Sequence, residues 1–366
     1  MIGIKTSIEL PMAHSLYRGA YSGLCVGNVY RDEDSDGHKN RYDLGTGVMP
    51  IQHGHNNIVT ISLSLDDSDL NKDGMVLDFK AFKKELHKHF DKYDHSLLMT
   101  PDNPLMEVYK KNFKDHGIVF HRTRLFPIGE NPTSEVLSMY WWYELYFLFS
   151  AKLGVNIEKL SVEYEETSHN SCTYSNDDTS SEIGVAFAGV YKLQNNKTGK
   201  IYIGQSANVI RRWTQELLRE TDTVSNELKE AIANSELDDW DVSILERVVD
   251  LSELKEREKY WIEFFDATNP EIGYNVQGGD PNTTFEKGYS IDDWKQDARS
   301  NNAEAIKTWK ENHPGARRES DRKYENTPCK DPITGETVTL TCLRARMKKH
   351  RDIYVNCPSA YKCKIN

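Results

Sequence analysis

The sequence has few cysteines and no long apolar run, and both absences narrow the class of protein. Its 366 residues include six cysteines, and no two of these are separated by only two residues. That number and spacing do not fit a disulfide framework, so we expect a reducing cytoplasm. No run of about 18 uncharged apolar residues occurs, and the first residues lack a basic segment followed by an apolar core. We therefore expect no membrane contact and no signal peptide.

Acidic residues outnumber basic ones over most of the chain. The net charge is −11, yet residues 295–366 contain 16 Lys and Arg against 9 Asp and Glu. The basic tail indicates either contact with nucleic acid or a solvated helical surface, and both interpretations stay open. The length predicts two or three domains.

Hydrophobic periodicity predicts an α+β first domain. Residues 53–65 alternate apolar and polar side chains, which is typical of a half-buried strand. Residues 79–90 have apolar side chains at helical spacing, a more apolar helix follows over 133–153, and a second strand covers 159–168. The polar stretch 176–184 is typical of a linker. We expect domains at 1–175 and 185–280, and a basic C-terminal region at 281–366.

Three histidines are candidate ligands of one metal ion. His53 and His55 flank Gly54 at the start of a predicted strand, where residues two apart project to the same face. His14, on the preceding predicted strand, can supply a third imidazole. Three neutral imidazoles with an open fourth position are typical of catalytic zinc. Taken alone, a His-x-His pair is more often an ordinary surface or core pair.

Six motifs occur in order over residues 1–175. They are His14, HGH at 53–55, GMVLDF at 74–79, Asp94-His95, NPTSE at 131–135 and EETS at 165–168. The series resembles the 6-pyruvoyltetrahydropterin synthase family, most closely its 6-carboxytetrahydropterin synthase branch. The resemblance implies the tunnelling fold, an antiparallel sheet with two helices on one face, in a hexamer-like homo-oligomer. It also implies a zinc-dependent lyase that converts 7,8-dihydroneopterin triphosphate, on the route to 7-deazaguanine and queuosine.

The same resemblance implies a role for each matching residue. His14, His53 and His55 match the zinc ligands, and Glu166 matches the carboxylate that anchors the pterin ring. Thr133 and Ser134 match the rest of that pocket. Asp94 and His95 match the pair that tunes the catalytic base.

Cys25 matches the catalytic thiol by its distance from His14, but it departs from the family pattern. The family cysteine lies a few residues before the HGH triplet, where this chain reads GVMPIQ, so a polar insertion at 28–44 would separate Cys25 from His53. The alternative is that Cys25 is a buried apolar residue. Among the other histidines, we expect His87 and His89 to be solvated.

A second set of motifs follows the polar stretch. Residues 188–203 predict a β-hairpin with the turn NNKTG, whose two strands carry Tyr191 and Tyr202. A helix with Arg211, Arg212 and Trp213 comes next, then a helix over 251–265, then GYN at 273–275. The series resembles the GIY-YIG endonuclease family, a small α/β nuclease domain, with GVY as the first triplet.

The resemblance implies a magnesium-dependent phosphodiester hydrolase that acts on DNA. Glu258 would hold Mg²⁺, Tyr191 would be the general base with Tyr202 beside it, and Arg212 rather than Arg211 would clamp the phosphate. Asn275 would orient the hairpin or a phosphate oxygen. Two alternatives remain, that Glu258 is an exposed helix acid and that the domain binds DNA without cutting it.

Together the two resemblances predict a bifunctional fusion in the cytoplasm of a bacterium or of a virus-infected cell. The alternative is a homing-type endonuclease that carries an inactive pterin-synthase-like scaffold. For the tail we expect a basic helix near 341–351 against DNA phosphates. A zinc site made of Cys329, Cys342, Cys357 and Cys363 is a further option.

Overall fold

A computed structural model describes residues 1–15, 53–71, 73–176, 178–179, 181, 183–218, 225–276 and 285–312, with short pieces between 328 and 342. The chain divides into two compact units, residues 1–295 and 296–366. Cys25 lies outside the described residues. So do the side chain of His53 and, apart from Cys342, the basic helix expected near 341–351.

Six strands form the larger sheet of the first unit, in the order β4-β3-β1-β2-β5-β6. Their bounds are β1 Ile2–Ser15, β2 His53–Leu65, β3 Leu97–Met99, β4 Leu125–Pro127, β5 Ile157–Thr167 and β6 Asn170–Ser175. Strands β1, β2, β5 and β6 pair antiparallel, as expected. Strands β3 and β4 differ from the expectation because they pair in parallel at one edge. Helix α2 (Pro104–Asp115) is the crossover that parallel neighbours require.

Alternating burial sets the inner face of this sheet. In β1 the buried apolar residues Ile8, Leu10 and Met12 lie two apart, and His14 continues the same row. In β2 the inner row includes Val59 and Ile61. Because the strand period is two, both rows carry their core-facing positions to the end of the sheet where the histidines lie.

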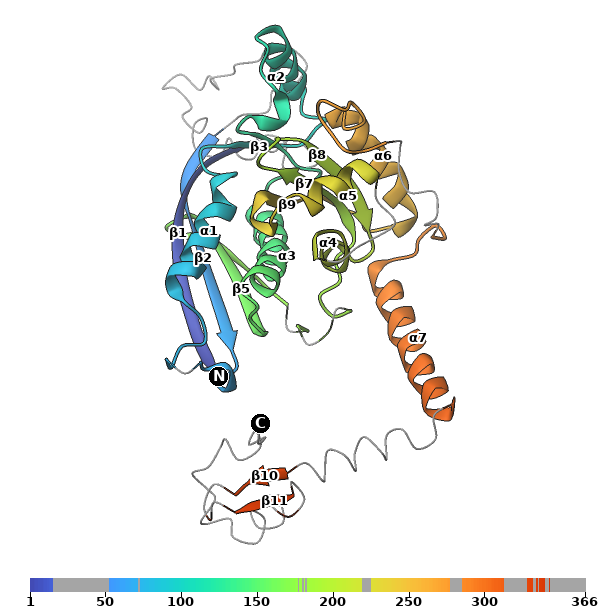
Figure 1. Cartoon of the computed structure of the whole chain (residues 1–366). Coiled ribbons are helices and arrows are strands. Elements are labelled where there is room, and N and C mark those ends of the chain that lie inside the picture. The colour runs from blue at the N-terminus through green and yellow to red at the C-terminus, as the bar shows by residue number, and fades with distance from the viewer. Residues whose placement is uncertain are drawn as a thin grey trace, which may run out of the picture. The chain divides into compact units, whose positions relative to one another are not determined.

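Two helices cover the inner face, α1 (Phe79–Asp91) and α3 (Ser134–Lys152). They pack on each other through Phe82 and Phe149, whose ring centroids are 5.0 Å apart. Helix α3 is apolar almost all round, which is typical of a helix buried on every side. Its Trp142 Nε1 donates to the carbonyl of Leu160 in β5 at 2.7 Å. The other side of α3 faces the second sheet (Figure 1).

The second sheet is small and antiparallel, in the order β8-β7-β9. Its strands are β7 Gly189–Asn195, β8 Ile201–Ser206 and β9 Trp240–Arg247, and its helices are α4 Val209–Leu218, α5 Asn226–Ala233 and α6 Leu254–Phe265. The hairpin predicted over residues 188–203 is present, formed by β7 and β8. Gly199 ends its turn with φ of +72°, which favours glycine, and Asn195 Oδ1 accepts from the amide of Lys197 at 2.9 Å.

The two sheets share one hydrophobic core. A single cluster of buried residues extends from β1 and β2 through α1 and α3 to β7, α4 and β9. The contacts include Tyr143 with Phe187, at 4.6 Å between ring centroids, and Phe147 with Trp213, at 5.4 Å. In the polar stretch 176–184, Thr179 Oγ1 donates to the carbonyl of Glu158 in β5 at 2.8 Å. Helix α3 therefore joins the two halves of the first unit.

In the second unit, β10 (Pro328–Lys330) pairs antiparallel with β11 (Thr337–Thr339). Helix α7 (Ile291–Asn312) contains the boundary between the units. Across the part of the chain that the structure describes, no helix has both the length and the apolar character that crossing a membrane requires.

Candidate metal centre and candidate nuclease site

Three donor side chains meet at the end of the larger sheet. His14 comes from β1, His55 from β2 and Glu166 from β5. The Nε2 atoms of His14 and His55 lie 3.2 and 3.4 Å from Glu166 Oε1, and one donor atom from each residue lies within 4.8 Å of the other two. An irregularity in the β5–β6 register falls at Glu166, and such bulges re-aim a side chain.

The orientation of the His14 ring fits metal binding. Its Nδ1 lies 2.9 Å from the carbonyl oxygen of Pro132. A carbonyl can only accept, so Nδ1 carries a hydrogen in this contact, and Nε2 is the ring nitrogen that points toward the other two side chains. Two imidazoles and a carboxylate are a common donor set of catalytic zinc. The residues present therefore fit a zinc ion.

The structure brings together a set of residues at this centre that differs in part from the set expected from the sequence. His14 and His55 are together as expected, and the β1–β2 register places position 53 directly opposite His14. Glu166 was expected at the pterin ring, whereas the structure places it against both imidazoles. Its contact with both imidazoles could not be read from EETS, because the irregularity in the β5–β6 register at this position has no sequence signal.

A cavity of about 360 Å³ lies beside His55, a size within the range of ligand pockets. Eight residues line it, namely Pro11, Met12, Ala13, Gly54, His55, Asn56, His95 and Ser96. His95 Nδ1 lies 2.9 Å from Asp94 Oδ2, so the predicted Asp94–His95 pair is in contact. His95 and the candidate metal ligand His55 therefore line the same cavity.

Thr133 and Ser134 begin helix α3. Thr133 is its N-cap residue, and its hydroxyl accepts from the amide of Val136 at 3.4 Å, while the half-buried Ser134 is the first helical residue. The preceding Pro132 supplies the carbonyl that holds His14. The NPTSE motif thus connects the start of α3 to the candidate metal centre.

The candidate nuclease site is built on paired strands. Tyr191 of β7 is 0% exposed, and its ring centroid lies 6.4 Å from that of Tyr202 in β8. Tyr191 lies opposite Gly204 in the register, and a Cβ at that glycine would be 2.4 Å from Tyr191 Oη. The glycine of the YIG triplet therefore makes room for the tyrosine of the first triplet.

Arg212 is engaged within the protein. Its Nε lies 2.9 Å from Oε1 of Glu216, one turn further along α4, and the Tyr191 hydroxyl donates to both Glu216 oxygens at 2.8 and 2.9 Å. Burial raises the pKa of Glu216 to about 7, although Arg212 and Tyr191 oppose that shift. The sequence analysis missed Glu216, and its i,i+4 spacing from Arg212 is the signal that was available.

Glu258 and Asn275 complete the predicted set. Glu258 on α6 is only 4% exposed, so the exposed-acid interpretation is wrong. It also acts on Tyr202, whose pKa is raised by burial first, then by Glu216 and by Glu258. Asn275 Oδ1 accepts from the amide of Ile203 at 2.9 Å, and its Nδ2 donates to the carbonyl of Ile203 at 2.8 Å. Asn275 thus fastens β8 directly after Tyr202.

A buried polar cluster connects the two halves of the first unit. Glu144 of α3 is 0% exposed and accepts from the Tyr93 hydroxyl at 3.0 Å and from the amide of Ile244 in β9 at 2.7 Å. Lys92 Nζ donates to Glu144 at 3.2 Å and to Ser243 Oγ at 3.0 Å. A buried carboxylate with this many donors holds α3 and β9 in one arrangement.

His89 corrects an expectation. It is 5% exposed rather than solvated, and its Nε2 lies 3.3 Å from Glu144 Oε2. Burial lowers its pKa well below the usual value, and Lys92 and Lys152 add to the effect. The expectation failed because spacing on an isolated helix cannot show that the second sheet covers that side of α1.

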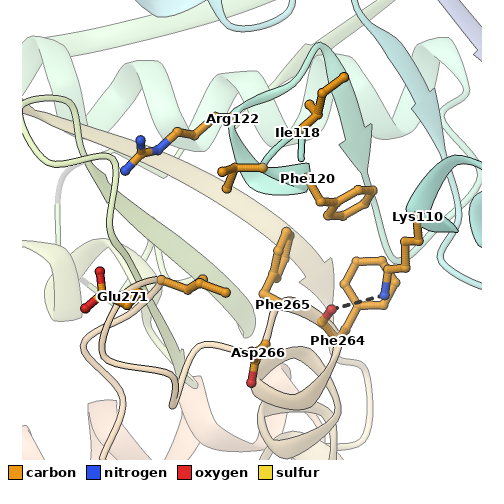
Figure 2. Close-up of a pocket in the computed structure, with 10 residues that line it drawn as sticks. Lys110, Ile118, Phe120, Arg122, Phe264, Phe265, Asp266 and Glu271 are labelled. Carbon is orange, nitrogen blue, oxygen red and sulfur yellow. Dashed lines mark hydrogen bonds between the residues drawn. The ribbon is translucent and has the colours of Figure 1, made fainter. Parts of the chain in front are cut away.

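A second cavity, of about 590 Å³, lies between α2 and the end of α6 (Figure 2). The rings of Phe120, Phe264 and Phe265 and the amine of Lys110 face it. Lys110 Nζ lies 3.3 Å from the Phe264 ring centroid and donates to the Phe264 carbonyl at 3.1 Å. Burial lowers the pKa of Lys110 to about 8. None of the residues that line this cavity belongs to either candidate site. The sequence analysis did not predict the cavity.

The two sites define a chain with two enzyme-type domains, one with a candidate metal centre that includes histidines and one with a tyrosine-lined hairpin. Residues 8–177 match the family model of 6-pyruvoyl tetrahydropterin synthase, and residues 187–271 match that of the GIY-YIG catalytic domain. The chain therefore contains a domain of the 6-pyruvoyl tetrahydropterin synthase family and a GIY-YIG nuclease domain, as the motifs predicted.

Individual relatives are distant. The 6-carboxy-5,6,7,8-tetrahydropterin synthase of Aquifex aeolicus (strain VF5) is 26% identical over 90 residues, which are 25% of this chain and 52% of the relative. The chain thus spans about half the length of that curated relative.

Three similar solved structures have low TM-scores. An uncharacterized protein, WS1659 from Wolinella succinogenes, has a TM-score of 0.30 at 18% identity, and 6-pyruvoyl tetrahydropterin synthase from Plasmodium vivax has 0.29 at 15%. Each match covers 48% of this chain and 99% of the other. A mutant catalytic domain of the intron endonuclease I-TevI has 0.22 at 20%, covering 27% and 99%. At these scores the α+β fold class rests on the chain's own sheets and helices.

Proposed function

We propose that the chain is a bifunctional fusion of a zinc-dependent 6-carboxytetrahydropterin synthase and a magnesium-dependent DNA endonuclease. The synthase domain would convert 7,8-dihydroneopterin triphosphate to a precursor of 7-deazaguanine nucleosides. The observation that carries this half is the meeting of His14, His55 and Glu166 within 4.8 Å. The proposed domains are residues 1–175 and 185–280, with 281–366 as a DNA-contacting extension.

His14, His55 and Glu166 would hold the zinc, with position 53 on the adjacent strand as a further donor. Zinc would act as a Lewis acid on an oxygen of the substrate. The carbonyl of Pro132 fixes the His14 ring so that Nε2 points toward Glu166. His95 would move a proton at its Nε2, since Asp94 holds the Nδ1 side of the ring. Cys25 remains the proposed thiol base, and Thr133, Ser134 and Glu166 the proposed pterin contacts.

Glu166 has two proposed roles, and one pair of measurements separates them. The Glu166→Ala variant should lose zinc affinity if the carboxylate is a donor, but should keep zinc and raise KM if it only anchors the pterin. Zinc content is measured by atomic emission after dialysis against a weak chelator. Glu163→Ala, a half-buried acid of the same strand, is the matched control.

The synthase proposal is tested by incubating the full chain with 7,8-dihydroneopterin triphosphate and following the product by chromatography. Product formation that is lost in His14→Ala and Cys25→Ala supports the proposal. If the wild-type protein holds zinc but forms no product, the synthase proposal is wrong. That result would favour the alternative, a nuclease attached to an inactive scaffold.

The nuclease half would hydrolyse a phosphodiester bond of DNA. Glu258 would hold Mg²⁺, which would neutralise charge on the phosphate. Arg212 would contact a phosphate oxygen, and Tyr191 would take a proton from the attacking water, with Tyr202 beside it. Asn275 would keep the hairpin in place through its two hydrogen bonds to Ile203.

The test is nicking of supercoiled plasmid DNA by the full chain with Mg²⁺. Glu258→Ala should abolish nicking, whereas Glu263→Ala, an exposed acid on the same helix, should not change it. Full nicking by Glu258→Ala would contradict the metal role. Binding without nicking by the wild type would favour a non-cutting DNA-binding module.

Assembly and location are further proposals. We expect a hexamer-like homo-oligomer formed through the larger sheet, in the cytoplasm of a bacterium or of a virus-infected cell. Light scattering of the full chain measures the oligomeric state, and a monomer at micromolar concentration would contradict the assembly.

A further inference from the structure

Glu216 is a buried carboxylate inside the candidate nuclease site to which the sequence motifs assign no role. It lies on α4 and is 1% exposed. The Tyr191 hydroxyl donates to both of its oxygens at 2.8 and 2.9 Å, and Arg212 Nε lies 2.9 Å from Oε1. The proposed base and the proposed phosphate clamp therefore meet at one carboxylate.

The packing around Tyr191 fixes the position of its hydroxyl group. Its Oη is held over Gly204, where even a methyl group would be 2.4 Å away. Its ring contacts Trp213 edge-on, with centroids 5.9 Å apart, and the side chain is fully buried. The single phenolic hydrogen is committed to Glu216, which leaves the lone pairs of Oη as acceptors. If Tyr191 acts as a base, another group must therefore accept its phenolic proton.

We propose that Glu216 is a positioning residue that accepts the phenolic proton of Tyr191 while Tyr191 takes a proton from the attacking water. This inference rests on the proposed nuclease function. An O–H bond of water breaks and its proton bonds to Tyr191 Oη, as the Tyr191 proton bonds to a Glu216 oxygen. The resulting hydroxide bonds to phosphorus, the bond from phosphorus to the leaving oxygen breaks, and that oxygen takes a proton from solvent water. Glu216 then returns its proton to solvent.

The charges around Glu216 suit this transfer. Tyr191 from β7, Tyr202 from β8 and Arg212 from α4 itself are the charged and titratable groups that act on it among the described residues. Burial raises the pKa of the carboxyl to about 7, against the opposing effects of Arg212 and Tyr191. Above neutral pH Glu216 is an acceptor, and below it the acid form blocks the transfer. The cleavage rate should therefore rise with pH through about 7.

The experiment measures single-turnover nicking of supercoiled plasmid DNA with Mg²⁺ from pH 5.5 to 9, with the full chain and Glu216→Gln. We expect Glu216→Gln to be roughly 100-fold slower at pH 8, the lower end of typical general-base contributions, and to lose the acidic limb of the profile. A purely structural role would lower the rate at every pH and keep the limb. Glu227→Gln, an exposed acid on α5, is the matched control.

Infrared difference spectroscopy of the same proteins gives a readout without DNA. The wild type should show a carboxyl band that disappears as pH rises through about 7, and Glu216→Gln should lack it. Retention of the acidic limb in Glu216→Gln, or a rate within threefold of the wild type, would overturn the proposal. A wild type that never nicks DNA overturns the nuclease function and the proton transfer together. The infrared band then reports separately that the Glu216 contacts exist.

Discussion

Strand register decides which individual side chains meet in this chain. His14 and His55 lie on paired strands whose inner rows end at the same edge of the sheet. Tyr191 and Gly204 are opposite each other on the β7–β8 hairpin. In both places a residue's chemistry depends on a neighbour far away in sequence, because pairing brings opposite positions to the same face.

The Gly204→Ala substitution tests the hairpin site. Its Cβ would meet the Tyr191 phenol at 2.4 Å, so we expect a loss of about 1–3 kcal/mol in the free energy of unfolding, as for other overpacked cores. Urea unfolding measures the loss. Gly3→Ala is the control, because no atom lies within 4 Å of a Cβ there. Equal effects of the two substitutions would contradict the packing described.

The raised pKa of Glu216 predicts a pH dependence of stability. A carboxyl with a folded-state pKa of about 7, above its usual 4.5, contributes stability that is fully present below pH 4.5 and is lost as pH rises through 7. Between pH 5 and 8 the wild type should lose on the order of 3 kcal/mol relative to Glu216→Gln. Urea unfolding of both proteins at the two pH values measures the difference. If the stability of the two proteins changed with pH in the same way, the pKa of Glu216 would not be raised in the folded state.

Much of each site was predictable at this scale, and what was not has a physical reason. Motifs in a family-like order marked His14, His55, Tyr191, Arg212 and Glu258 as candidates, because the expected chemistry restricts the residue type. Glu216 and the metal-facing position of Glu166 were not predicted. Their contacts depend on burial and on a local strand irregularity, which no short motif encodes.

At the scale of elements, helix α3 shows what periodicity can and cannot tell. An apolar helix was expected over 133–153, and the structure has one over Ser134–Lys152 with Thr133 as its cap. The apolar surface on all sides indicated deep burial but not the partner. The second sheet fills that place, with Glu144 accepting from Ile244 of β9.

Removing the Glu144 carboxylate should loosen α3 from β9. In Glu144→Ala the half-buried Lys92 and the buried Tyr93 lose this carboxylate acceptor, and we expect a loss of about 3–5 kcal/mol in unfolding free energy, as when one member of a buried pair is removed. Glu144→Gln should lose less, since the amide oxygen still accepts from the Ile244 amide. Thermal and urea unfolding measure both. Equal losses in the two variants would show that hydrogen bonding does not matter here.

At the scale of the whole molecule, the motifs identified both domains but did not show that the two domains pack together on one core. Composition marked 176–184 as a linker, because it is polar and nearly free of apolar residues. In the structure, the residues described there bond to β5 and α3, and a single hydrophobic cluster extends across both sheets. Contacts between distant segments decide this arrangement, and composition carries no information on them.

The shared core predicts that residues 1–295 unfold as one cooperative unit. Calorimetry of the full chain should show one main transition for the two domains, and limited proteolysis should not separate them at 176–184. The Glu144→Ala variant should split the transition if the α3–β9 contact couples the domains. Two well-separated transitions in the wild type would contradict a common core.

The most direct test of the account is X-ray absorption at the zinc edge of the full chain. We predict one zinc with imidazole nitrogen and carboxylate oxygen neighbours at about 2.0–2.2 Å, lost in His14→Ala. A shell of sulfur atoms at about 2.3 Å that persists in His14→Ala would place the metal on the cysteines of residues 329–363 and contradict the account.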